Sequence, residues 1–156
     1  MNILLAAIKA RVTTLLTGVV YDDPVGGQSP VAIHLGALPA KRSETDQGQD
    51  FPFVVIRPLG GSGDRAEQLT TVRLICGIYS GTDEIETGVF QVHDLAERLL
   101  AIQSERGFKP YRLILPVTWK FGDESDPGNQ GNQPHPFYFL TIDLSFKSAS
   151  LADLKP

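Results

Sequence analysis

The side chains in this 156-residue chain that could do chemistry are few and scattered. His34 falls in an irregular stretch, His93 in an amphipathic segment and His135 between two prolines. Cys76 is the single cysteine, and it alternates with apolar residues, a setting in which cysteine behaves as a small hydrophobe. A nucleophilic pair of Cys76 and His93 is therefore disfavoured, and we predict no catalytic residue.

Motifs for metals and cofactors do not occur either. The sequence has no Cys-x-x-Cys, no His-x-x-x-His and no acidic loop with calcium-binding spacing. The glycine-rich GGSGDRAE, residues 60–67, matches neither the phosphate loop nor the dinucleotide fingerprint, and it joins two expected strands where those motifs open a helix. We therefore expect no metal, no cofactor and no enzymatic activity.

Composition excludes further classes of protein. The 14 basic and 18 acidic residues give a net charge of -4, which offers no general attraction for nucleic acid or an anionic membrane. No segment approaches the roughly 20 apolar residues of a membrane span, and Lys9 and Arg11 interrupt the N-terminal apolar stretch where an export signal would continue. One cysteine cannot form an internal disulfide. We expect a single soluble domain, residues 1–156, in a reducing cytoplasm.

Two stretches have the periodicity of helices. Apolar residues recur at steps of three and four over residues 2–17, and Gly18 follows as a stop. A wider apolar stripe runs over residues 84–106, with Asp83 placed as N-cap and Glu86 completing a capping box. The second of these is expected to be the long helix that covers the sheet.

Four stretches alternate apolar and polar residues as strands do: 52–58, 69–79, 111–121 and 137–146. Only one of the helices lies between strands, which favours an α+β fold over a parallel one. We predict a mainly antiparallel four-stranded sheet, packed on one face by the N-terminal helix and the long central helix; residues 31–35 could add a short extra strand. Pro116 lacks the N–H for a sheet ladder, so its strand should lie at an edge or be bulged.

Three polar stretches are predicted as long loops: 21–50, 59–67 and 122–134. Pro134 and Pro136 fix their own φ and keep the residues before them out of the helical region, so they should stiffen the entry into the last strand. Loops on a rigid sheet are the usual place for binding. Without a catalytic set, the protein is expected to work by contact with other protein subunits.

Several of these stretches resemble a known family in order and spacing. FPFVVIRPL, TTVRLICGIYSG, the long amphipathic helix, YRLILPVTW and NQPHPFYFLTIDLSF are similar to the tail terminator, or tail completion, proteins of long-tailed phages and prophages. The resemblance covers about residues 51–147. Its most specific part is the entry into the last strand: Gln133, Pro134, His135, Pro136 and Phe137.

The resemblance implies a structural virion protein of the siphophage type, made in the host cytoplasm and placed in the tail or neck of the particle. Such subunits form a homo-oligomeric ring, here expected to be a hexamer, on the head-proximal end of the tail tube. The ring ends tube polymerisation and offers a docking face for the head–tail connector protein. DNA passes through its lumen without specific binding, and no membrane is involved.

The residues of the strand entry are therefore candidates for contact with another subunit or with the tube. Asp64 and Arg65, at the turn between the first two strands, are further candidates for an intersubunit contact. Two alternatives stay open from the sequence. One is another neck protein, such as a head-closure or connector subunit, and the other is a small hydrolase that uses His93 or His135.

Overall fold

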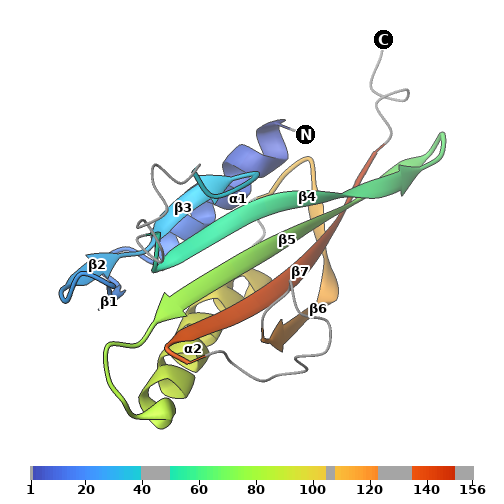
Figure 1. Cartoon of the computed structure of the whole chain (residues 1–156). Helices are drawn as coiled ribbons and strands as arrows, with labels where there is room; N and C mark the ends of the chain where they lie inside the picture. The colour runs from blue at the N-terminus through green and yellow to red at the C-terminus, as the bar shows by residue number, and fades with distance from the viewer. Residues whose placement is uncertain (1, 40–49, 105–107, 123–134, 150–156) are drawn as a thin grey trace.

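The computed structural model describes residues 2–39, 50–104, 108–122 and 135–149, which form an α+β structure with two helices and two sheets (Figure 1). The helices are α1 (Asn2–Leu15) and α2 (Ile85–Leu100), and a 3₁₀ turn (Ala101–Ser104) follows α2. The larger sheet has the strand order β3-β4-β5-β7-β6. Its strands are β3 (Ala32–Leu35), β4 (Phe53–Gly63), β5 (Glu67–Tyr79), β6 (Arg112–Phe121) and β7 (Phe137–Ala149). A small hairpin of β1 (Val20–Asp22) and β2 (Gln28–Pro30) forms the second sheet.

The predicted four-stranded, mainly antiparallel sheet is wrong. β3 is a full member of the sheet and pairs in parallel with β4, from Ala32 opposite Phe53 to Leu35 opposite Ile56, so the sheet is five-stranded and mixed. The predicted loop 21–50 also contains the end of β1 and all of β2; its residues 40–49 lie outside the described part. Strands of three and four residues between prolines and glycines are too short for alternation to reveal them.

The predicted loop 59–67 is wrong as well, because most of it is strand. β4 continues to Gly63 and β5 starts at Glu67, so residues 59–69 form a projecting hairpin, called the arm below (Figure 1). Glycine is disfavoured in strands, but β5 is paired on both sides here, with β4 and with β7 as far as Glu67 opposite Ala149. Of the predicted loop 122–134, only Gly122 is described.

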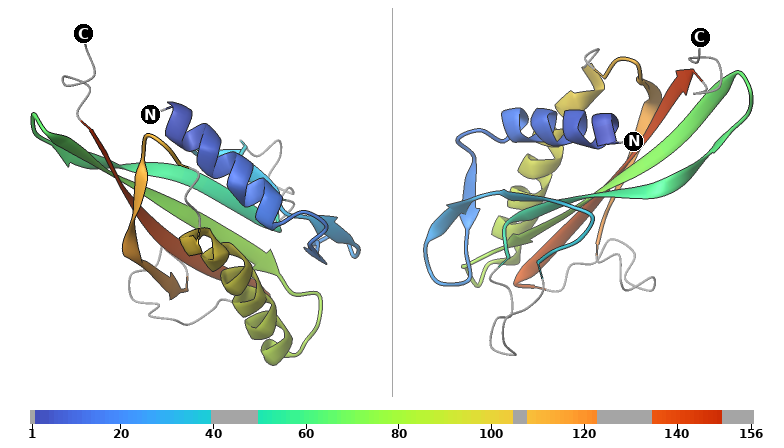
Figure 2. Two further views of the ribbon diagram at one scale, coloured as in Figure 1. Left: turned by 180° about the vertical axis from the view of Figure 1, so that it is seen from behind. Right: turned by 90° about the horizontal axis from the view of Figure 1, so that it is seen from above.

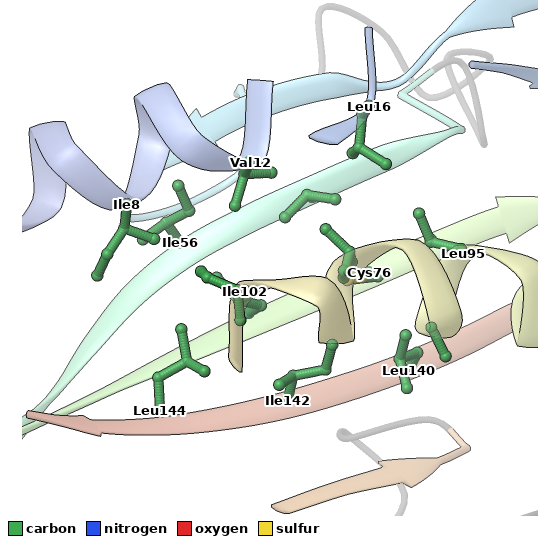
Figure 3. Close-up of a cluster of buried hydrophobic side chains, with 14 of the residues drawn as sticks. Ile8, Val12, Leu16, Ile56, Cys76, Leu95, Ile102, Leu140, Ile142 and Leu144 are labelled. Carbon is green, nitrogen blue, oxygen red and sulfur yellow. The ribbon is translucent and has the colours of Figure 1, made fainter. Parts of the chain in front are cut away.

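Both helices lie on the same face of the larger sheet (Figure 2). Every second residue of β5 and β7 points to them, and the set Val72, Leu74, Cys76, Ile78, Leu140, Ile142 and Leu144 is completely buried. α1 adds Leu4, Ile8 and Val12, and α2 adds Val92, Leu95 and Leu99. Ile8, Val12 and Leu95 are labelled in Figure 3. Burial of each such side chain stabilises the fold by about 1.5–3 kcal/mol. The opposite face of the sheet has no described helix over it.

The strand with Pro116, β6, is both at the edge of the sheet and bulged. It pairs only with β7, and its register shifts between Ile114 and Thr118, where Pro116 lies. Trp119 of this edge strand is 49% exposed. The prediction from Pro116 is therefore confirmed.

The capping box expected at the start of α2 does not form. The N-cap is Glu84, and its side chain makes no capping hydrogen bond. Instead, the Tyr138 hydroxyl of β7 donates to the carbonyl oxygen of Ile85 over 3.2 Å. The first turn of α2 is thus held by the sheet rather than by its own side chains.

Candidate functional site

The residues best suited to catalysis lie on separate elements. His93 stacks on Phe121 of β6 with ring centroids 4.3 Å apart, and His34 lies on β3. The Cys76 thiol is completely buried under the helices, and this burial raises its pKa well above the usual value. Among the described residues, no three His, Cys, Asp or Glu side chains come together to hold a metal ion. The features that remain as candidates for function are surfaces of the described part of the chain.

An aromatic cluster covers one end of the open face of the larger sheet, which is the face opposite the two helices. It consists of Phe51, Phe53, Tyr79, Phe137 and Phe139. Phe51 is central to it, with ring centroids 4.9 Å from Phe53, 4.9 Å from Phe137 and 5.8 Å from Phe139. Such pairs are worth about 0.5–1.5 kcal/mol each beyond their buried area. The rings thus form a firm apolar surface with no described helix over it.

Gly77 of β5 makes room for these rings. A methyl group on Gly77 would overlap the rings of Phe51 and Phe53. Phe53 is opposite Gly77 in the sheet register, and Phe53 is only 3% exposed although no described helix covers it. Because Gly77 has no side chain, the rings of the aromatic cluster can pack directly against the backbone of β5.

A hollow of about 370 Å³, called the edge pocket, opens beside the aromatic cluster. Phe51 belongs to both, and the other lining residues include Asp23, Val25, His34, Asp50 and Pro52. The Asp23 carboxylate accepts hydrogen bonds from the Ser29 hydroxyl at 2.7 Å and from the backbone N–H groups of Gly27 and Val25. These bonds, the one from Ser29 first, lower the pKa of Asp23, so it is ionised at neutral pH.

The centre of the open face carries an ion pair. Arg73 of β5 and Asp143 of β7 are opposite each other, and their two hydrogen bonds measure 2.7 and 3.0 Å. Arg57 donates to the carbonyl oxygen of Gly36 over 3.1 Å. The two strand arginines thus bond to different partners, a carboxylate on the next strand for Arg73 and a backbone carbonyl for Arg57.

The described part of the predicted strand entry is held against α2. His135 Nδ1 lies 2.7 Å from the Tyr138 hydroxyl, which in turn donates to Ile85. The peptide bond between His135 and Pro136 is cis, and the Pro136 carbonyl accepts from the Ser80 N–H at 2.9 Å. Phe137 enters the aromatic cluster, while Gln133 and Pro134 lie outside the described residues.

The other two predicted contact residues form the tip of the arm. Asp64 accepts hydrogen bonds from the N–H groups of Ala66 at 2.7 Å and Glu67 at 2.9 Å, and its own N–H donates to Glu67. Arg65 is exposed, and within the described part of the chain its guanidinium has no ion pair or hydrogen bond. Asp64 therefore shapes the turn, and Arg65 is presented by it.

The structure separates the predicted contact residues into two groups. The arm tip adjoins Glu67 at the start of β5, whereas Phe137 pairs with Tyr79 at its end. A strand of 13 residues spans roughly 40 Å at about 3.3 Å per residue.

Sequence reasoning missed the edge pocket and most of the aromatic cluster. The signal that it overlooked is Gly77, a glycine inside a strand, which often marks a close approach of other groups.

Comparison with known proteins gives no match: no family model and no curated protein matches this chain. Among the helices of the described residues, none is both long and apolar enough to cross a membrane.

Proposed function

We propose that this protein is a structural subunit that assembles into a closed ring and serves as a tail terminator of a long-tailed phage. The observation that carries the proposal is the placement of two different surfaces, the exposed arm and the partly buried aromatic cluster with its edge pocket, at opposite ends of one sheet. Contacts between unlike surfaces generate rings when the rotation closes.

The sequence resemblance supports the position of this ring in the particle. It covers residues 51–147, which contain β4, β5, α2, β6 and most of β7, so the matching segments make up most of the larger sheet. In this proposal the ring caps the head-proximal end of the tail tube, stops its polymerisation and presents a docking face to the head–tail connector. The net charge of -4 agrees with a lumen through which DNA slides without binding.

The open edge of β6 adds a surface for axial contacts. Trp119 and Leu115 on this strand are 49% and 58% exposed, and β6 has a described sheet partner on only one side. Exposed strand edges pair readily with other chains, and Pro116 with its bulge limits this edge to selected partners. We assign this edge to contact with the tube or the connector.

The proposed function is tested by mixing the purified protein with tail tube protein of the same phage and imaging the tubes by negative stain. We expect density at one end of each tube and a stop in tube growth. Uncapped tubes that grow at the same rate with and without the protein would contradict the proposal.

A further inference from the structure

The arm tip carries a basic side chain, Arg65, and the edge pocket is lined by two acidic ones, Asp23 and Asp50. The tip presents the guanidinium of Arg65, which has no partner among the described residues, because Glu67 is paired with Lys147 at 3.3 Å and Asp64 is engaged by the turn. The edge pocket presents the carboxylates of Asp23 and Asp50 above apolar walls that include Phe51. A guanidinium on an apolar stem suits such a pocket, since it binds carboxylates in a fixed geometry and packs against aromatic faces.

Asp50 is the carboxylate free to accept this partner. The described residues include no hydrogen bond or ion pair to its side chain, whereas Asp23 already accepts three hydrogen bonds. The pocket volume of about 370 Å³ lies in the range of sites that enclose a small group, about 300–1,000 Å³. The pocket is therefore large enough to take an arginine side chain.

The two surfaces cannot meet within one chain. Phe53, next to the edge pocket, and Gly63, next to the arm tip, are the first and last residues of β4, an 11-residue strand of roughly 35 Å. β4 is paired with β5 along this length, so the sheet holds the ends apart. A contact between the two surfaces therefore requires a second copy of the chain.

We propose that the arm of one subunit reaches its neighbour and places Arg65 in the edge pocket, against Asp50. This contact rests on the proposed ring and supplies its lateral interface. The hydrogen bonds of Asp64 keep the tip in one shape before binding, which lowers the entropy that association must offset. The exposed Leu69 of the arm extends the contact over the aromatic cluster.

Charge reversal tests this contact. Arg65→Glu and Asp50→Arg should each raise the concentration at which half of the chain is assembled by at least about tenfold, as for a close interfacial charge pair. Lys9→Glu and Glu97→Arg make the same charge changes at exposed helix positions and should leave assembly as in the wild type. Thermal unfolding of each variant by circular dichroism verifies that it is folded.

Mixing the two reversed variants gives the sharper result. The acidic arm tip of the Arg65→Glu protein meets the basic pocket of the Asp50→Arg protein in one contact. In the next contact around the ring, the unchanged tip of the Asp50→Arg protein meets the unchanged pocket of the Arg65→Glu protein. An equimolar mixture of the two variants should therefore form rings again. Wild-type rings that persist in both reversed variants would overturn the Arg65 contact but not the ring. A wild-type chain that never assembles would overturn both.

Discussion

At the scale of single residues, Gly88 and Tyr138 fix the position of α2 on the sheet. The Tyr138 ring is completely buried and lies against the helix backbone at Gly88, where any side chain would overlap it. The hydroxyl of Tyr138 then reaches both His135 and the first turn of α2. The histidine of the stiffened strand entry thus acts first as a structural residue that orients Tyr138.

Replacing Gly88 with alanine should destabilise the protein even though alanine is the better helix former. The added methyl group must displace the Tyr138 ring, and overpacking of this kind costs about 1–3 kcal/mol. Urea unfolding measures the loss, with Glu86→Ala as the control on the exposed side of the same helix. Adding Tyr138→Leu to the variant should recover part of the loss; a Gly88→Ala protein as stable as the wild type would contradict this packing.

Asp94 connects the small hairpin to α2. Its carboxylate accepts hydrogen bonds from the Tyr21 hydroxyl at 2.7 Å and from Arg98 Nε at 2.9 Å. Partial burial acts to raise the pKa of Asp94, but the bonds from Arg98 and Tyr21 and the charge of Arg98 together lower it. A depressed pKa means that the ionised form contributes stability above the unfolded pKa of about 3.9, which is lost as pH falls through the folded value.

The stability difference between the wild type and Asp94→Asn should therefore depend on pH. At pH 7 the variant should be less stable by up to about 1 kcal/mol, the range of a partly exposed ion pair. The difference should shrink as pH falls below about 4, the unfolded pKa, and should disappear once pH is below the depressed folded pKa of Asp94. Chemical denaturation at pH 7, 4 and 3 checks this, with Glu97→Gln, at an exposed position of the same helix, as the matched charge control.

At the scale of elements, the arm is the most unusual part of the fold. All residues from Arg57 to Glu67 are exposed, yet β4 and β5 remain paired out to Gly63 opposite Gln68. A bulge between Pro58 and Gly60 shifts the register at its base, and Gly60 has a φ of +143° that favours glycine. The pairing of β5 with β7 supports the arm from its other side.

Asp64 should control the order of the arm tip. Asp64→Ala removes the acceptor for the Ala66 and Glu67 N–H groups, so their amide hydrogens should exchange several-fold faster while the melting temperature stays the same. Asp64→Asn keeps an acceptor oxygen and should retain most of the protection. Exchange measured by NMR tests this, and equal rates in the wild type and Asp64→Ala would contradict the role of this side chain.

The long elements were predictable because their apolar periodicity matches a buried face. This holds for α1, the main part of α2, and the centres of β5 and β7, whose alternating residues are completely buried. Prediction failed where neighbouring strands rather than periodicity decide the structure. The glycine-rich arm is strand because β5 is paired there with β7 as well as with β4.

The candidate site was less predictable than the fold. Asp64 and Arg65 were identified from their place at a turn, and residues 135–137 from the strand entry. The edge pocket needs Asp23, His34 and Phe51 from three segments, and their proximity depends on the parallel pairing of β3 with β4. That pairing has no local signal in the sequence, so neither the pocket nor its relation to Arg65 could be inferred from it.

At the scale of the whole molecule, groups that are buried in their neutral form should make the folded state less stable at alkaline pH. Burial raises the pKa of the Cys76 thiol, and burial together with the bond to Asp94 raises the pKa of Tyr21. A raised folded pKa means that the contribution is complete below the unfolded pKa, about 8.5 for cysteine and about 10 for tyrosine, and is lost at higher pH.

The free energy of unfolding should therefore fall by roughly 3 kcal/mol between pH 8 and about 10.5, since each pKa unit is worth about 1.36 kcal/mol. Urea unfolding over this pH range measures it. Cys76→Ala is less stable near neutral pH, because it leaves a small cavity, but its dependence on pH should be flatter up to about pH 10. A wild-type profile that is flat over the whole range would contradict the burial of the neutral thiol.

We propose that the sheet, with unlike surfaces at its two ends, brings copies of the chain together into a closed ring. Native mass spectrometry of the purified protein over a series of concentrations, with negative-stain images of the same samples, tests it most directly. We predict one dominant oligomer, expected to be a hexamer, that forms closed rings and increases in population as concentration rises. A protein that remains monomeric at every concentration, or that forms open filaments without a defined size, would contradict the claim.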